Sequence, residues 1–469
     1  MDRASIIGSG PNGLAVAIVL AKAGLAVDVY EAEAQPGGGA RTLPLTLPGY
    51  LHDFGSAVHP MAVGSPFFRT LPLEQNGLHW IHSPAAVAHP LDDGTAVILW
   101  RDFETTCSNL GEDRKRWKDL FQPFAENWWA FAPEILGPVI HVPQHPLLLA
   151  RFGRNGIQPA KFFAHNQFNN TRTRAVFAGL SAHSFLSLDA PVTAGVGMIL
   201  AITVHAVGWP IPQSGAQEIT NALAAHLESL GGSIHTGHRV TSMNDLPDAL
   251  ALCDISPRQL LDIAGERLEP AYKKTLSEFQ LGHGAFKIDY ALSEPIPWRA
   301  QDCALSATVH LGGTLDAIAH SEKEMSQGRI SDRPFVLLSQ PSLFDPTRAP
   351  AGKHTAWVYC HVPNGSTIDV TQRIEDQIER FAPGFRECVQ ARRVSAPADL
   401  QAADANLIGG DIMAGNMNIR QMLWRPSRHL YATSNPKIYL CSASTPPGGG
   451  VHGMCGYHAA TMALRDLRG

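Results

Sequence analysis

The feature that most constrains this chain is a glycine turn near its beginning. Residues 4–7 form an apolar, strand-like run, the turn Gly8-Ser9-Gly10-Pro11-Asn12-Gly13 follows, and an almost wholly apolar stretch covers residues 14–23 before Gly24. A second strand-like run, residues 26–30, ends at Glu31. This order predicts a strand, a glycine turn, a buried helix and a second strand, which is typical of a parallel sheet covered by helices on both faces.

Each part of this turn has a physical reason if the ligand is a dinucleotide. Gly8 permits a tight turn, Gly10 lets the backbone approach a pyrophosphate, and Gly13 lets the helix pack closely on the strand. The helix N-terminus then offers free N–H groups to the phosphates. Glu31 lies 18 residues after Gly13, where a carboxylate can accept hydrogen bonds from an adenosine ribose and would repel a 2′-phosphate. NAD and FAD both satisfy this pattern.

A second glycine cluster, residues 37–39, is followed by Ala40 and Arg41. Burying a doubly charged pyrophosphate is costly unless it is paired, and a helix terminus contributes only about 0.3–1 kcal/mol per favourable charge. Arg41 can supply the missing positive charge. The alternative, a flexible surface loop with a solvated arginine, remains open from these residues alone.

Two later stretches also have an α/β pattern. Residues 214–217 suggest a capping box before a helix that ends at Gly231 and Gly232, and strand-like pieces follow at 233–235, 239–241 and 249–253. Ser256 and Pro257 then suggest a capped helix. Near the end, residues 437–441 predict a strand, 442–450 a glycine and proline loop, and 451–467 a helix.

The 469 residues are enough for two or three domains. The α/β pieces predict a Rossmann-type domain, with a parallel sheet between helices, formed by residues 1–80, 206–262 and 426–469. Residues 81–205 and 263–425 are expected to form an interleaved α+β substrate domain.

The loop before the last helix carries three successive glycines, Gly448 to Gly450, followed by Val451 and His452. Such a run costs conformational entropy and fills no core. Three successive glycines are explained if the backbone of this loop contacts a flat ring. A helix N-terminus beside an isoalloxazine would also stabilise the negative charge of a reduced flavin.

These motifs together resemble a known family. Glu31, the 37–41 cluster, the run Gly49, Tyr50, Asp53 and Gly55, and the P-P-G-G-G-V-H-G-M loop at 446–454 are similar to the phytoene desaturase-like (carotenoid desaturase) branch of the FAD-dependent amine oxidase superfamily. The branch that includes pyridine nucleotide-disulfide oxidoreductase domain-containing protein 2 is the most similar. No cysteine pair follows the first glycine motif, so disulfide reductase chemistry is not expected.

The resemblance implies non-covalent FAD with a defined set of contacts. Glu31 would lie at the ribose, Val240 beside the adenine, and Gly450 and Val451 at the flavin ring. The remaining cofactor contacts would be Gly8, Gly10, Pro11, Asn12, Gly13, Gly38, Gly39 and Arg41.

Candidate catalytic residues are His59, His452 and Tyr457, which lie near the expected flavin contacts in the sequence. The histidines could act as acid or base, although chance placement explains them as well. Tyr457 is the only aromatic residue of the terminal motif that could face an amine substrate.

Composition excludes several function classes. Lys and Arg number 37 against 42 Asp and Glu, a net charge of −5, which leaves no basic stripe for a nucleic acid. The seven cysteines are scattered without C-x-x-C spacing, so neither a disulfide framework nor a structural metal site is expected.

No signal peptide is expected, and we interpret 192–209 as a buried helix. A cytoplasmic location fits best, with peripheral membrane contact possible.

The sequence therefore predicts an FAD-dependent oxidoreductase that dehydrogenates, desaturates or isomerises a largely apolar substrate by hydride transfer to flavin N5. The sequence does not identify the electron acceptor, and oxygen and a quinone both remain candidates. Two alternatives remain: a flavin amine oxidase that produces hydrogen peroxide, and a non-catalytic interaction protein that contains FAD.

Overall fold

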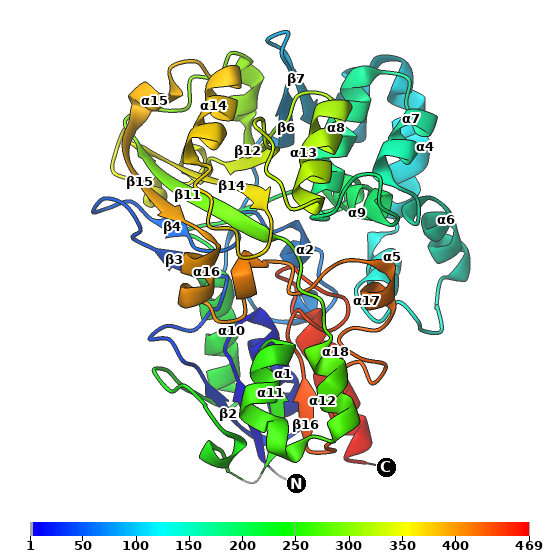
Figure 1. Ribbon diagram of the computed structural model, residues 1–469, viewed down its shortest axis with the longest axis vertical. Coiled ribbons are helices and arrows are strands. Elements are labelled where there is room, and N and C mark those ends of the chain that lie inside the picture. The colour runs from blue at the N-terminus through cyan, green and yellow to red at the C-terminus, as the bar shows by residue number, and fades with distance from the viewer. Residues whose placement is uncertain (1–2, 248, 469) are drawn as a thin grey trace.

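The computed structural model describes residues 3–247 and 249–468. The chain forms two layered parts around two sheets, one drawn at the bottom and one at the top of Figure 1. The N-terminus and the C-terminus both lie at the bottom, beside the first sheet.

The first sheet has five strands in the order β16-β10-β1-β2-β9, and every neighbouring pair is parallel. Helices cover both faces of this sheet. The apolar residues on one face pack with α1, α10 and α18, and those on the other face pack with α11 and α12. The strands and helices are β1 (Arg3–Ile7), β2 (Ala26–Tyr30), β9 (Ser233–His235), β10 (Leu250–Cys253), β16 (Ile438–Leu440), α1 (Pro11–Lys22), α10 (Gln217–Ser229), α11 (Pro257–Ala264), α12 (Pro270–Ser277) and α18 (Met454–Asp466).

The second sheet has seven strands in the order β15-β11-β14-β13-β12-β6-β7. All neighbouring pairs are antiparallel except β6 and β12. Its strands are β6 (Ala85–Pro90), β7 (Ala96–Leu99), β11 (Gly284–Leu292), β12 (Ser306–Leu311), β13 (Val336–Ser339), β14 (His354–Val362) and β15 (Val389–Ser395).

Helices cover the second sheet on both faces as well. The apolar residues of α14 and α15 join one strand face in a common cluster, and α8, α9 and α13 pack on the opposite side. The helices of this part are α3 (Phe103–Ser108), α4 (Arg114–Ala125), α5 (Trp128–Ile135), α6 (Pro146–Gly156), α7 (Ala160–Gln167), α8 (Thr171–Ala182), α9 (Thr193–Ala206), α13 (Leu315–Ser326), α14 (Thr371–Phe381), α15 (Phe385–Cys388), α16 (Pro397–Ala403) and α17 (Ile419–Leu423).

Two short ribbons and one short helix link the parts. The ribbons are β3 (Thr42–Leu43) with β4 (His52–Asp53), and β5 (Trp80–Ile81) with β8 (Ile211–Pro212); the helix is α2 (Pro60–Val63). The expected fold class, a Rossmann-type parallel sheet with a separate mixed α+β part, is confirmed.

Two local predictions are wrong. Residues 239–241 form no strand. The expected capping box at 214–217 is absent, because Ser214 has a left-handed backbone (φ 67°) and α10 is capped from elsewhere in the chain. Asp53 Oδ1 accepts the N–H of Ala216 at 2.8 Å, and Thr42 Oγ1 accepts that of Gln217 at 3.1 Å.

The stretch 192–209 contains α9, whose side chains are mostly buried against α8 and α4. None of the helices in the described part of the chain has the length and apolarity needed to cross a membrane.

Candidate functional site

The glycine turn lies at the carboxyl end of β1, where its geometry requires glycine at two positions. Gly8 has φ +93° and donates its N–H to Tyr30 O at 2.8 Å, which closes the turn against β2. A Cβ on Gly13 would lie 2.1 Å from Gly8 O, so no other residue allows α1 to begin this close to β1. Pro11 is the first residue of α1, where a missing N–H costs nothing.

Glu31 follows β2 and is held beside this turn. Its Oε2 accepts the N–H of Ser9 at 2.9 Å and the hydroxyl of Ser9 at 2.6 Å, and its Oε1 accepts the N–H of Glu33 at 2.9 Å. These bonds orient the carboxylate while leaving further lone pairs on both oxygens. Glu31 therefore has the position and the free acceptor capacity that a ribose contact needs.

The second glycine cluster packs against the first. A Cβ on Gly38 (φ +53°) would lie 3.4 Å from Gly10 Cα, whereas a Cβ on Gly39 would meet nothing within 4 Å. Arg41 is buried and ties the loop down: its Nε donates to Gly38 O at 2.8 Å and its Nη2 to Ala403 O at 2.7 Å. Its Nη1 lies 3.8 Å from a Glu33 carboxylate oxygen, so the positive charge is only loosely neutralised.

The C-terminal loop approaches the same turn through α18. A Cβ on Gly456 would lie 2.0 Å from Asn12 O, and one on Gly453 would lie 3.1 Å from the Ala15 side chain. This contact brings the loop 448–451, which precedes α18, alongside the start of α1. Gly450 is exposed and has φ +130°, and Val451 is half-buried.

Two carboxyl groups that the sequence did not single out, the buried Asp254 and the half-buried Asp404, lie beside the glycine loops. Asp254 follows β10, and its Oδ2 accepts the N–H of Gly13 at 2.9 Å. Burial raises the pKa of Asp254 to about 7, with smaller contributions from Asp404 and Glu31. Burial also raises the pKa of Asp404. The position of Asp254 at the end of a strand next to β1 was the available signal, because carboxyl ends of parallel strands share one edge.

These residues fit a dinucleotide. The Asn12 N–H makes no hydrogen bond within the described part of the chain, and the buried Asn12 Oδ1 likewise has no partner there. Backbone at Gly10, Gly38 and Gly39 is partly accessible. The site therefore offers free polar groups at a helix N-terminus, with the Arg41 charge nearby, as a pyrophosphate requires.

The candidate catalytic residues lie around the junction of α2 and α18. His59 is buried, its Nε2 pairs with Ser56 Oγ at 2.9 Å, and burial lowers its pKa to about 4. His452 is also buried with its pKa lowered to about 4, and its Nδ1 accepts the N–H of Met454 at 3.0 Å, so it caps α18. The Tyr457 ring packs on Phe67 with centroids 5.2 Å apart. Their catalytic roles, like the individual FAD contacts and Val240 at the adenine, stay predictions.

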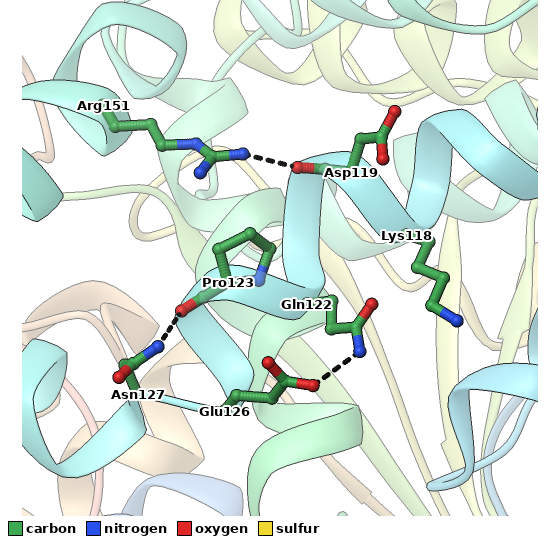
Figure 2. Close-up of a pocket in the computed structure, with 7 residues that line it drawn as sticks. All are labelled: Lys118, Asp119, Gln122, Pro123, Glu126, Asn127 and Arg151. Carbon is green, nitrogen blue, oxygen red and sulfur yellow. Dashed lines mark hydrogen bonds between the residues drawn. The ribbon is translucent and has the colours of Figure 1, made fainter.

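A hollow in the helical part lies apart from these residues. Figure 2 shows its lining, and Arg151 Nη2 donates there to Asp119 O at 2.8 Å. None of the predicted FAD contacts lines it. Its lining residues are Lys118, Asp119, Gln122, Pro123, Glu126, Asn127 and Arg151.

Comparison with known proteins agrees with this geometry. Residues 6–71 match the family described as NAD(P)-binding Rossmann-like domain. Pyridine nucleotide-disulfide oxidoreductase domain-containing protein 2 of Rattus norvegicus is 24% identical, over 99% of this chain and 94% of the relative. Phytoene desaturase (lycopene-forming) of Pseudescherichia vulneris is 23% identical, over 99% of both chains. The chain is thus similar over nearly its whole length to that relative and to phytoene and zeta-carotene desaturases, in agreement with the resemblance seen in the sequence.

Solved structures show the same fold. An oxidoreductase from Methanosarcina mazei has a TM-score of 0.68 and 18% identity, covering 99% of this chain and 100% of that one. Cyclohexylamine oxidase from Brevibacterium oxydans has a TM-score of 0.59 and 14% identity, covering 100% and 99%. The chain thus has the fold of these oxidoreductases, and its curated relatives are oxidoreductases and desaturases.

Proposed function

We propose that this oxidoreductase dehydrogenates a largely apolar organic substrate next to FAD. The observation that carries the proposal is the convergence of the two ends of the chain: Gly456 in α18 touches the first turn of α1 at Asn12, while Gly38 touches Gly10. One end of the site therefore suits a diphosphate and the other presents backbone at Gly450. Bound FAD would supply a two-electron oxidant that takes a hydride at N5.

In this proposal the chain's own residues bind and orient. Glu31 would hold the ribose, and the N-terminus of α1 together with Arg41 would balance the diphosphate charge. The loop 449–451 would contact the flavin ring, and the N-terminus of α18 that follows this loop would stabilise the reduced form. Both His59 and His452 are neutral at pH 7, because burial lowers their pKa values to about 4; they can accept a hydrogen bond or a proton but carry no charge.

The apolar character of the substrate is supported by the face of the second sheet that α8, α9 and α13 cover. Phe185, Trp209, Phe335 and Tyr359 are all buried there, and Phe185 stacks with Tyr359 at a centroid distance of 6.1 Å. Aromatic side chains next to a substrate would exclude water from it, which favours hydride transfer over side reactions.

The visible spectrum of the purified protein tests the cofactor, and its redox cycle tests the reaction. We expect oxidised flavin bands, release of a compound that contains adenine on heating, and reoxidation by oxygen or a quinone after anaerobic photoreduction. Production of hydrogen peroxide after the addition of amines would instead identify the protein as an amine oxidase. A bound flavin that cycles with no donor or acceptor would assign a non-catalytic FAD protein and overturn the proposal.

The proposal extends to peripheral membrane contact by the segment between α5 and α6 together with the first turn of α6. Ile140, Val142 and Leu147 are 60%, 92% and 87% exposed, and the exposed Arg151 and Arg154 follow them on α6. Apolar side chains beside arginines suit an anionic lipid surface. Sedimentation with vesicles of phosphatidylcholine and phosphatidylglycerol tests this, and Val142→Glu with Leu147→Glu should abolish it; binding unchanged by these substitutions would exclude the segment.

A further inference from the structure

The carboxyl group of Asp254 lies on the side of Gly10 that the glycine motif leaves without a side chain. The second glycine of this motif has no Cβ, which lets a diphosphate approach its backbone. In this chain a Cβ on Gly10 would lie 2.9 Å from Asp254 Oδ2. The carboxyl group is therefore adjacent to the place that the diphosphate of a bound FAD would take.

Asp254 also uses part of the N-terminus of α1. Its Oδ2 accepts the N–H of Gly13 at 2.9 Å, whereas its Oδ1 makes no hydrogen bond to the residues that the structure describes. Asn12 is 6% exposed, and its Oδ1 has no partner among these residues either. Polar groups beside Asp254 are thus available to a ligand.

The charged groups that face Asp254 are acidic. Burial raises the pKa of Asp254 to about 7, the Gly13 N–H opposes this, and Asp404 and Glu31 raise it further. No lysine or arginine within residues 3–247 and 249–468 forms an ion pair with Asp254. The positive charge of Arg41 acts on Asp404, where it partly offsets the effect of burial.

The thiols that face Asp254 from neighbouring elements carry no charge. They belong to Cys253 in β10, Cys441 after β16 and Cys455 in α18. Burial raises the pKa of each thiol above the ordinary value of 9.0. None of them supplies a positive charge that could balance a carboxylate next to a diphosphate.

We propose that Asp254 is protonated in the FAD complex and donates its O–H group to a diphosphate oxygen. A carboxylate at this position would repel the diphosphate, whereas a carboxylic acid donates a strong hydrogen bond to an anionic oxygen. Oδ1 is free to carry the proton while Oδ2 continues to accept the Gly13 N–H. The proton comes from water, one for each FAD bound. This inference rests on the proposed function for the cofactor only.

A proton fits this position better than a metal ion does. The described residues contain no group of three or more His, Cys, Asp or Glu side chains arranged to hold a metal ion. Asp254 and Asp404 come from different segments, and Asp404 Oδ1 already accepts the N–H of Asn406 at 3.0 Å. We therefore expect FAD binding to depend on pH and to be independent of divalent cations.

The sign of the pH dependence follows from the two states of Asp254. In the FAD-free protein the carboxyl group loses its proton as pH rises through about 7, and a nearby diphosphate raises this pKa in the complex. Above pH 7 the complex therefore holds more protons than the FAD-free protein. The dissociation constant of FAD should increase by up to about tenfold for each pH unit in this range.

The test measures release of FAD from the holoenzyme. Serial dilutions at pH 6 and pH 8.5, with EDTA present, are passed through an ultrafiltration membrane, and FAD in the filtrate gives the dissociation constant. We expect this constant to be at least about fivefold larger at pH 8.5 in the unchanged protein.

Three matched Asp→Asn variants identify the group that takes up the proton. Asp254→Asn keeps an oxygen for the Gly13 N–H and offers an amide N–H at every pH, so its two dissociation constants should agree within about twofold. Asp404→Asn should retain the pH dependence, because Asp254 is still present. Asp262→Asn, an exposed position of α11, is the control and should behave like the unchanged protein.

Infrared difference spectroscopy observes the proton directly and needs no variant. At pH 8 the holoenzyme should show a C=O stretching band of a protonated carboxyl group that disappears when FAD is released. Equal affinity at both pH values in the unchanged protein would overturn the proposal. So would a pH dependence that persists in Asp254→Asn, one that is lost only in Asp404→Asn, or tighter binding when Mg²⁺ replaces EDTA.

Failure of the proposed function is recognised separately. A purified protein that contains no flavin and takes up none refutes the cofactor and this inference together. A holoenzyme that binds FAD equally at both pH values keeps the cofactor and refutes only the role of Asp254. A flavin that cycles with no donor or acceptor refutes the proposed reaction, and the binding measurements still decide the role of Asp254.

Discussion

Gly456 packs directly on the carbonyl oxygen of Asn12: a Cβ at position 456 would lie 2.0 Å from that atom. The contact joins the first turns of α18 and α1, helices that lie at opposite ends of the sequence. Because the obstacle is backbone, it cannot rotate away as a side chain could. The separation of the two helix N-termini, and hence the width of the site between the loops 8–13 and 448–451, depends on a glycine at this position.

Gly456→Ala should therefore destabilise the protein and weaken FAD binding together. Overpacking of this kind costs about 1–3 kcal/mol, and moving α18 outward displaces the loop 448–451. Urea unfolding and the ratio of flavin to protein absorbance measure the two effects. Gly153→Ala is the control, because that position lies within α6 and a Cβ there would meet nothing within 4 Å. Equal stability and flavin content in both variants would contradict the interpretation.

The first crossover could be predicted from sequence because its determinants are local. β2 occupies residues 26–30 as expected, and α11 begins with the predicted Ser256 cap, in which Ser256 Oγ accepts the Gln259 N–H at 3.3 Å. The start of α10 could not be predicted, because its cap is supplied by Thr42 and Asp53 from a distant ribbon. A local residue pattern predicts helices and turns, but it does not predict contacts between segments that are far apart in the sequence.

The same distinction applies to the site. Glu31 could be placed beside the glycine turn from spacing alone, because both belong to one βαβ unit. Asp254 could not, since the Gly13 N–H that it accepts comes from a remote segment of the chain. The role of such a side chain depends on its burial and on its hydrogen-bond partner, and neither can be predicted from the sequence.

The buried pair of Arg348 and Asp53 should be a major source of stability. Arg348 Nη2 lies 2.6 Å from Asp53 Oδ2, and neither side chain is exposed. Burial alone would raise the pKa of Asp53, but Arg348, with the Ala216 N–H and the Thr42 hydroxyl, lowers it. Arg348→Met leaves a buried carboxylate without its partner and should cost about 3–5 kcal/mol in urea unfolding.

The control for this prediction is Lys115→Ala, which removes an exposed pair with Asp119 in α4 and should change stability by less than about 1 kcal/mol. Since the pKa of Asp53 is lowered in the folded state, its contribution is present above the unfolded value near 4 and is lost as pH falls below it. An acid unfolding curve identical in Arg348→Met and the unchanged protein would argue against the pair.

Glu31→Ala and Arg41→Ala should each reduce FAD retention. Glu31 is the proposed ribose acceptor, and Arg41 combines a positive charge with bonds to Gly38 O and Ala403 O that shape the loop. Arg41→Lys keeps the charge but loses the forked geometry, so it should retain an intermediate amount. The flavin-to-protein absorbance ratio after gel filtration measures retention, with the exposed Arg239→Ala as the control. Full occupancy in both alanine variants would refute these assignments.

Asp254→Asn should change how stability depends on pH. The pKa of Asp254 is raised to about 7, first by burial and then by Asp404 and Glu31, so its contribution to stability is full below the unfolded value near 4 and is lost as pH rises through 7. Asparagine keeps an oxygen for the Gly13 N–H and carries no charge at any pH. We therefore expect the variant to gain stability relative to the unchanged protein between pH 5 and pH 8, by about 1.4 kcal/mol for each pKa unit at most. Urea unfolding of the FAD-free protein at these two pH values measures the gain, and a constant difference between the two proteins would show that Asp254 does not titrate in this range.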